Sequence, residues 1–472
     1  MRHIGFRKCR TFIGCLLSLI LAGSCKKFVQ ISPAPSTLVG TQIFADSADA
    51  TAAVVGIYSQ LNVGGNSYSI GNGAMTFYTA LSSDELIPNI SNNNVNEFYN
   101  NAISPIDNST LASVFWNSPY SLIYQANACI EGLLNSAALS KSLKSELLGE
   151  CQLFRAMMYF NMVNIFAGVP LVGSTNYTVN ESLPRTTVDS VYSLILWDLY
   201  CSVSMLGDAY ITAGRNRPNK YAAEALLSKV FLYRARWDSA VIESANIIGS
   251  GMYSLEIDPN NVFLANSNEA IWQLLSSNLN YETSEGRLLV PTSNKVIPTY
   301  TINNNLLNAF ETGDLRRTDW IDSNLVNGVA YYFPYKYKVG YEPGLSTPIE
   351  SYTVFRLAEQ YLIQAEALAE LGQFAQADSN INIIRARAGL DKLEPTTLPL
   401  AMDAIMHERR IELFCEWGNR WLDLKRTNTV DQVLGSPGNE KPEWPSDGHA
   451  VLYPIPSTQL QLNPFLVQNV GY

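Results

Sequence analysis

Helical periodicity is the feature of this sequence that most restricts its fold. Apolar residues recur every three or four positions through much of the chain, so that each such segment would bury one face of a helix. The segments with this spacing are 47–61, 110–135, 142–166, 187–206, 217–249, 352–388 and 400–418. Hydrophobic residues make up 47% of the chain and charged residues 16%, which suffices for a large core. We therefore predict a mainly α fold with a few short strands.

Two of these segments contain the spacing of a tetratricopeptide-like helical hairpin. In each, small residues on one helix are followed by a turn, and then by an aromatic residue three positions before an alanine. The aromatic residues are Trp237, before Ala240, and Phe374, before Ala377. Alanine lets paired helices approach closely, and the ring fills the gap at the turn. The pattern predicts a tetratricopeptide-like helical hairpin scaffold, of which two incomplete copies are visible.

Two regions interrupt the helical pattern and are rich in loop-forming residues. Residues 62–108 contain a glycine-rich stretch, VGGNSYSIGNG, and an asparagine-rich one, PNISNNNVNEFYNN. Residues 275–345 contain polar loops and the aromatic run 331–337, and a short strand is expected just before them at 270–275. We predict loops rather than core elements over 62–108, and short mixed strands with polar loops over 250–345. Together they would form an irregular, loop-rich face on the helical scaffold. The last fifty residues are predicted to form an extended tail.

The N-terminus has the pattern of an export signal. A positively charged start is followed by an apolar stretch, Thr11–Ala22, which is too short to span a bilayer. The residues Leu21-Ala-Gly-Ser-Cys25 then read as a lipobox, in which the Cys25 thiol is acylated after cleavage. The alternative is a plain secretory signal cut near Ser24. We predict a lipoprotein signal peptide over 1–24, a lipidated tether over 25–40 and a single folded body over 41–472.

Charge and cysteine usage exclude several classes of function. Removal of the signal peptide takes away four basic residues and leaves 28 basic against 42 acidic residues, a net charge of −14. A nucleic-acid binder needs a concentrated basic face, so we predict no nucleic-acid partner. The other cysteines of the mature chain show neither a CxxC pair nor a zinc pattern. We expect buried free thiols, or one bond between two of them in an exported protein, at Cys129, Cys151, Cys201 and Cys415.

The densest polar segment, 407–423, invites interpretation as a metal or catalytic site. Its His407-Glu408 pair lacks the second histidine that a helical zinc site places four residues after the first. Charges three or seven residues apart, as in Arg409 with Glu412 or Glu416, would lie on one helix face and are more simply interpreted as a buried or half-buried ion network that fixes helix contacts. The charged residues of this segment are His407, Glu408, Arg409, Arg410, Glu412, Glu416, Arg420 and Asp423.

No other motif indicates an enzyme. Asp84 and Glu85 are adjacent, so on a helix they would diverge by about 100° instead of facing each other across a cleft as glycosidase carboxylates do. A GxSxG elbow, a P-loop and a dinucleotide-binding glycine motif are all absent from the sequence. We predict a protein with no catalytic residues, no metal and no cofactor.

Four ordered segments form a further pattern. They are RAMMYF at 155–160 leading to FAGVPL at 166–171, RLAEQYLIQAE at 356–366, ERRIEL at 408–413 with GNRWLDLK at 418–425, and LYPIP at 452–456 with Asn463-Pro464 and the terminal Gly471-Tyr472. In order and spacing, across almost the whole mature chain, these segments resemble the SusD/RagB family of outer-membrane nutrient-binding lipoproteins.

The resemblance implies a helical body with tetratricopeptide-like hairpins on one side and ligand-binding loops on the other. It also implies a non-catalytic lipoprotein, anchored in a bacterial outer membrane and exposed at the cell surface. Such a protein captures an oligosaccharide or peptide and delivers it to a SusC-like TonB-dependent transporter. Lys26 and Lys27 depart from the acidic residues that often follow the lipidated cysteine, which bears on surface exposure.

The loop regions combine aromatic rings with amide and carboxylate groups, the two kinds of group that bind sugars. Rings stack on the C–H face of a pyranose, while amides and carboxylates bond its hydroxyls. The expected ligand-binding residues are Tyr68, Asp84, Asn94, Phe98, Tyr99 and Tyr281, although each ring could instead pack against its own loop. The tryptophans on helical stripes are predicted to lie in the core; they are Trp116, Trp197, Trp237, Trp417 and Trp421. Trp320 and Trp444 fall outside the stripes and stay unassigned.

Two other functions stay open at this stage. A surface glycoside hydrolase would release reducing sugar from a glycan. A tetratricopeptide-like adaptor would bind protein partners tightly and have no soluble ligand.

Overall fold

The computed structural model describes residues 40–61, 69–276, 280–436, 441, 444–445 and 447–472. The predicted signal peptide, Cys25 and Tyr68 lie outside the described residues. By its internal contacts the chain divides after Ile43, so the short helix α2 (Gly40–Ile43) belongs to the first unit. All other elements belong to the second unit, Phe44–Tyr472.

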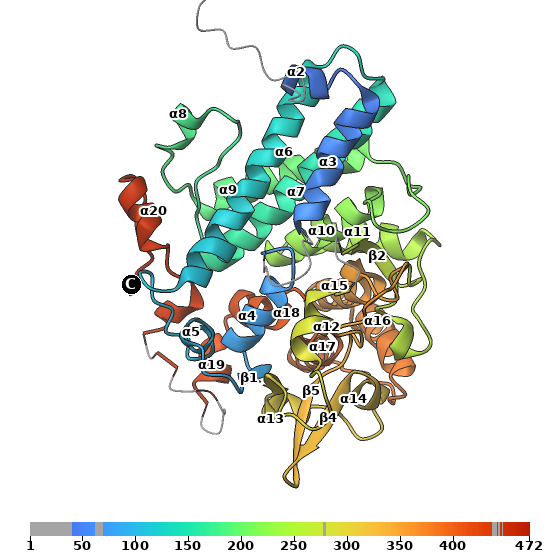
Figure 1. The fold of residues 1–472 in the computed structure, drawn as a ribbon. Helices are drawn as coiled ribbons and strands as arrows, with labels where there is room; N and C mark the ends of the chain where they lie inside the picture. Colours follow the sequence, from blue (N-terminus) through green and yellow to red (C-terminus); the bar gives the residue numbers. More distant parts are fainter. Residues whose placement is uncertain (1–39, 62–68, 277–279, 437–440, 442–443, 446) are drawn as a thin grey trace, which may run out of the picture. The chain divides into compact units, whose positions relative to one another are not determined.

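Long helices that pack on one another in succession form the body of the second unit (Figure 1). They are α3 (Ser47–Leu61), α6 (Ser118–Asn135), α7 (Lys141–Phe166), α9 (Val188–Met205), α10 (Lys220–Tyr233), α11 (Trp237–Gly249), α15 (Leu357–Glu370), α16 (Phe374–Arg387) and α17 (Leu398–Glu412). Side-chain caps start several of them: Ser140, Thr187 and Asn219 each accept a backbone N–H from the first turn of α7, α9 and α10. The prediction of a mainly helical fold is confirmed.

Both predicted hairpins are present and turn through the same motif. After α15 the N–H of Gln373 donates to the carbonyl of Leu368, and that of Gly372 to Ala369. After α10 the N–H of Arg236 donates to Phe231, and that of Ala235 to Leu232. These bonds define a Schellman turn, whose central residue is left-handed, with φ of 74° at Gly372 and 52° at Ala235. Across the Gly372 turn, Ala365 and Ala369 of α15 meet Ala377 of α16 in one apolar cluster.

Strands are few, and in the described residues each pairs with one partner, antiparallel. β1 (Leu86–Pro88) pairs with β3 (Tyr300–Ile302), and β2 (Ala270–Leu274) pairs with β6 (Tyr352–Arg356). β4 (Ile321–Val326) and β5 (Val329–Pro334) form a hairpin that is visible in Figure 1. Its turn, Asn327-Gly328, has φ of 50° and 80°, as a two-residue hairpin turn requires. The predicted strand at 270–275 is confirmed to within one residue.

Shorter elements complete the unit, and three of them correct a prediction. Residues 62–108 were expected to contain loops rather than core elements, but they hold β1, α5 (Asn93–Tyr99) and the helix α4 (Ala74–Ser82), all nine of whose residues are buried. The glycine-rich stretch that precedes α4 indicates a loop, and it conceals the short helix in the sequence. The other short elements are α8 (Tyr177–Asn180), α12 (Ser284–Leu289), α13 (Asn304–Leu307), α14 (Leu315–Asp319), α18 (Asn419–Arg426), α19 (Val430–Leu434), α20 (Ser457–Leu462), the π-helix Leu111–Asn117 and the 3-10 turns Pro259–Asn261 and His449–Val451.

Other predictions need smaller corrections. The segment 352–388 begins with strand β6 rather than a helix, and the predicted tail contains α19 and α20. Trp197 is 66% exposed on the outer face of α9, so its assignment to the core is wrong. Trp116, Trp417 and Trp421 are buried as predicted, Trp237 is half-buried, and the unassigned Trp320 is fully buried. Cys129, Cys151, Cys201 and Cys415 are free thiols, and three of them are buried. Among the described helices, none is long and apolar enough to cross a bilayer.

Candidate functional site

Two of the predicted ligand-binding residues are buried and cannot reach a ligand in this structure. Phe98 is 0% exposed, because its ring packs between those of Tyr78, Phe115 and Tyr453. Asp84 is 2% exposed and accepts hydrogen bonds from Arg410 and Arg420. Burial by itself would raise the pKa of Asp84, but the two guanidinium groups hold the pKa well below its usual value. Both residues therefore have structural roles.

The remaining candidates lie at opposite ends of α4. Tyr281 is close to the start of α4. Three residues after Tyr281, the Ser284 hydroxyl donates to the side chain of Asn72 at 2.5 Å, and Asn72 stands two residues before α4. The Phe98 carbonyl accepts from the Ser82 hydroxyl at the other end, which places Tyr99 there. Nine residues of helix, about 13 Å, separate the two ends. Asn94 and Tyr99 are half-buried on α5, where Asn94 bonds Ser109 and the Lys441 ammonium lies 5.7 Å from the Tyr99 ring.

Tyr281 belongs to an aromatic surface that the sequence did not reveal. Its ring meets that of Tyr341 with centroids 5.0 Å apart and an interplanar angle of 41°. Tyr341 is 56% exposed, and the Arg287 guanidinium lies 5.8 Å from the Tyr281 ring. Two rings and a planar multiple donor are the groups that bind a sugar by stacking and hydrogen bonding. The signal for Tyr341 was its place in Gly340-Tyr341-Glu342-Pro343-Gly344, where a large ring stands among turn formers.

Two buried glutamates hold the loop that carries Tyr341. The Glu282 carboxylate accepts the backbone N–H groups of Ile349 and Glu350, at 2.6 and 2.7 Å. The Glu350 carboxylate in turn accepts those of Lys338 and Val339, at 2.6 and 3.1 Å. Both ends of the loop between 338 and 350 are thereby fixed to the segment that carries Tyr281. The two rings are thus positioned by bonds to the backbone of the loop.

A glycine allows this loop to lie directly on α12. A Cβ placed on Gly286 would come within 2.3 Å of the Val339 carbonyl oxygen, so that no larger residue fits without a shift of the backbone. The tyrosine surface therefore depends on a close contact between α12 and the loop, which the absence of a side chain at Gly286 permits.

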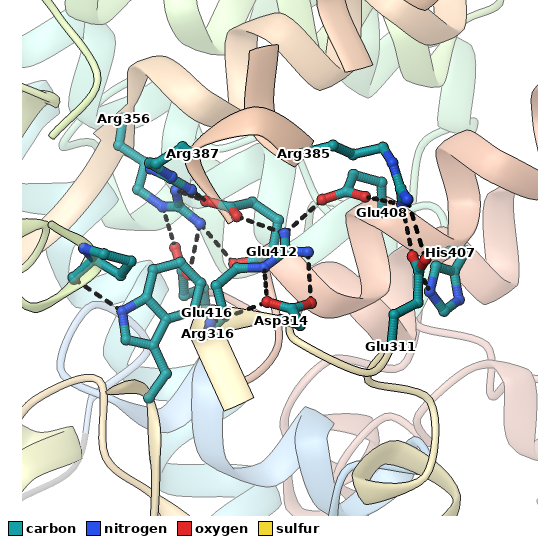
Figure 2. A network of polar contacts seen from close by, with 12 residues as sticks. Glu311, Asp314, Arg316, Arg356, Arg385, Arg387, His407, Glu408, Glu412 and Glu416 are labelled. Atoms are coloured by element: carbon teal, nitrogen blue, oxygen red, sulfur yellow. Dashed lines mark hydrogen bonds and ion pairs between the residues drawn. The ribbon is translucent and has the colours of Figure 1, made fainter. Parts of the chain in front are cut away.

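A network of charged residues is buried in the second unit, as Figure 2 shows. Arg356 donates five hydrogen bonds in this network. Two go to the Glu416 carboxylate, one each to the carboxylates of Glu269 and Glu412, and one to the Glu412 backbone carbonyl. Arg316 joins Asp314 to Glu408 and Glu412. Burial alone would raise the pKa of Glu412, but Arg387, Arg356 and Arg316 hold the pKa well below its ordinary value.

The prediction of a buried ion network over 407–423 is confirmed, but its pairing was wrong. Arg409 bonds Asp423 at 2.8 Å and lies 3.9 Å from Glu366, rather than pairing with Glu412 or Glu416. The partners of Glu412 come from distant segments, which helical spacing cannot reveal. His407 is half-buried, 3.7 Å from Glu311. Within the part of the chain that the structure describes, no acidic, histidine or cysteine cluster could hold a metal ion.

Stability is expected to reach its maximum near pH 5. Burial raises the pKa of Glu85, Glu285 and Glu350 to about 7 from an ordinary value of 4.5. A carboxyl group whose pKa is higher in the folded than in the unfolded protein stabilises the fold fully below pH 4.5, and this contribution is lost as the pH rises through 7. The depressed pKa values of Glu412 and Asp84 act in the opposite sense, since their contribution is present above about pH 4.5 and is lost as the pH falls.

Thermal unfolding between pH 3.5 and 8.5 measures this profile. We expect the free energy of unfolding to fall by at least about 1 kcal/mol from pH 5 to pH 8, since one pKa unit corresponds to about 1.4 kcal/mol. Glu285→Gln is the matched variant, because it removes one titrating group and should flatten the alkaline side alone. A stability that rises steadily up to pH 8 would contradict the assignment of raised pKa values.

Comparison with known proteins agrees with this architecture. Residues 319–472 match the model of the SusD family, and residues 51–232 match the SusD-like model described as starch-binding and associating with the outer membrane. SusD-like protein P25 of Formosa agariphila is 26% identical, with 95% of this chain and 97% of that protein covered. A SusD-like protein of Bacteroides ovatus is 24% identical over 66% of this chain and 64% of that protein.

Solved structures share the fold. A SusD superfamily protein from Bacteroides vulgatus superimposes with a TM-score of 0.78 at 20% identity, covering 90% of this chain and 99% of that one. A laminarin-binding SusD-like protein gives 0.75 at 24% identity, and surface glycan-binding protein A from Bacteroides uniformis gives 0.77 at 19%, each with the same coverage. The two matched models together span the helical scaffold and the charged C-terminal part, and the chain is therefore a member of the SusD/RagB family.

Proposed function

We propose that this protein captures a glycan on the surface formed by Tyr281 and Tyr341. The observation that carries the proposal is the ring pair itself, with centroids 5.0 Å apart, Tyr341 largely exposed and the Arg287 guanidinium 5.8 Å from the Tyr281 ring. Exposed, pre-positioned rings lose little entropy when a sugar stacks on them. Tyr68 lies outside the described residues, and its contact with the glycan stays a prediction from the sequence. Asn94 and Tyr99 would contact only a longer ligand, since they lie at the far end of α4.

The proposal extends to the membrane and to a partner. Acylation of Cys25 would anchor the protein in the outer membrane, and the captured glycan would pass to a SusC-like TonB-dependent transporter. Support comes from the matched model described as associating with the outer membrane and from the name of the surface glycan-binding protein of Bacteroides uniformis. Cys25→Ser is expected to move the protein from the membrane fraction to the soluble one; retention at the membrane would contradict the anchor.

Calorimetric titration of the mature protein tests capture directly. The panel is laminarihexaose and maltohexaose as neutral glycans, alginate oligosaccharides as acidic ones, and a mixed peptide digest. We expect saturable binding of a glycan with no reducing sugar released over the same period. Release of reducing sugar would instead support a hydrolase, and tight binding of peptides alone would support an adaptor or a peptide transporter.

A further inference from the structure

A pocket of about 610 Å³ opens among the helices of the scaffold, apart from the tyrosine surface. Its walls come from the start of α11, the end of α15, one face of α17, and the helices α18 and α19. Met402, Met406 and Arg410 line it from α17, where their spacing of four residues places them in one row. Its volume lies in the range of pockets that hold small organic ligands.

One wall of the pocket is apolar and contains an indole ring. Trp237 begins α11 and lines the pocket together with Met402 and Met406. The sequence pattern assigned Trp237 to the core, as the ring that fills a hairpin turn, but the structure leaves it half-buried. A partly exposed indole beside two methionines offers a flat apolar surface of the kind on which a pyranose ring stacks.

The rest of the lining is polar and is held rigidly by ion pairs. Arg410 and Arg420 both bond the buried Asp84, each at 2.7 Å. Arg426 pairs with both carboxylate oxygens of Glu366. Because these partners fix the side chains, their remaining donor and acceptor positions are arranged before a ligand arrives, which lowers the entropy cost of binding.

The charges of the lining nearly cancel. Three arginines stand against four carboxylates, and one of the four, Asp403, is exposed to solvent. A pocket of this composition has no large net charge with which to select an anion or a cation. The pocket suits a neutral molecule whose many hydroxyls both donate and accept hydrogen bonds, and which has an apolar face that can stack on Trp237. A neutral sugar has this chemistry.

We propose that the pocket is a second carbohydrate site, which takes the end of a neutral oligosaccharide. The two sites are distinct: Asp84 lies just beyond the end of α4, behind Arg410 and Arg420, whereas Ser284 and Tyr281 lie by its start. The inference deepens the proposed glycan capture but does not share its residues. A glycan chain that occupies both sites is held more tightly than one bound at either site alone.

Fluorine NMR of the mature protein labelled with 5-fluorotryptophan tests this pocket separately. The chain contains eight tryptophans, and the Trp237 resonance is the one lost in Trp237→Phe. We expect titration with a panel of neutral oligosaccharides, including laminarihexaose and maltohexaose, to shift this resonance saturably. The shift should persist in Tyr281→Ala. It should vanish in Gln432→Arg, which fills the mouth of the pocket from an exposed position.

Affinity provides the second measurement. Trp237→Ala is expected to weaken hexasaccharide binding about tenfold, while the affinity for a disaccharide at Tyr281 stays unchanged. A Trp237 resonance that stays fixed up to 20 mM of every neutral sugar, while Tyr281-dependent binding is present, overturns the second site. A shift produced only by glucuronate or peptides also overturns it. A shift at Trp237 with no Tyr281-dependent binding would support the second site and reject the proposed function.

Discussion

Arg356→Ala is expected to lower the free energy of unfolding by about 3–5 kcal/mol, the range for removing one partner of a buried ion pair. The variant leaves Glu269, Glu412 and Glu416 buried without the cation that all three share. Arg356 is 2% exposed, so water cannot replace the five lost hydrogen bonds. Urea unfolding, followed by circular dichroism, measures the loss.

Two comparisons identify the source of this effect. Arg234 pairs with Asp189 at 2.6 Å, but the side chains are 36% and 78% exposed, so Arg234→Ala should cost less than about 1 kcal/mol. The deficit of Arg356→Ala should also shrink toward pH 4, where the stranded carboxylates can take up protons. A loss below 1 kcal/mol at pH 7, similar to that of Arg234→Ala, would show that the network is not essential for stability.

Tyr281→Ala is expected to weaken glycan binding about thirtyfold, equivalent to about 2 kcal/mol, as for an aromatic residue at the centre of a binding surface. The substitution removes one ring of the pair and the support for the other. Because Tyr281 is half-buried in a loop, the free energy of unfolding should change much less than the affinity. Calorimetric titration with the glycan that binds the unmodified protein measures the change.

Matched variants separate loss of binding from loss of structure. Tyr177 is 74% exposed on α8, so Tyr177→Ala should leave the affinity unchanged. Phe98→Ala should lower the free energy of unfolding and leave the glycan affinity unchanged, since it opens a cavity in the core without touching the surface. In a double-mutant cycle the effects of Tyr281→Ala and Tyr341→Ala should be non-additive, because the rings are in contact. Unchanged affinity in Tyr281→Ala would reject this surface as the ligand site.

Sequence patterns predicted the features that depend on residues close together in the chain. The hairpins at Trp237 and Phe374 were found because helix pairs that turn tightly need small and aromatic residues at fixed separations. The helix α4 was missed because it follows a glycine-rich stretch that indicates a loop, and β6 was included in a helix because it runs directly into α15.

Tertiary contacts between distant segments account for the other errors. Glu412 faces Arg316, Arg356 and Arg387, which are 96, 56 and 25 residues away, so no helical rule could pair them. Asp84 was offered as a sugar ligand because it stands in a polar segment, yet its partners lie 326 and 336 residues further along the chain. Tyr341 becomes a candidate ligand-binding residue through its ring contact with Tyr281, which the fold places beside it.

The loop around Tyr341 is held through its main chain, and this affects how such a binding surface can evolve. Glu282 and Glu350 bind backbone N–H groups, which every residue except proline possesses. Substitutions between 340 and 348 can therefore change the chemistry presented to a ligand while the anchors of the loop stay in place. Selection for a new nutrient could act on these side chains one at a time, with no new scaffold required at any step.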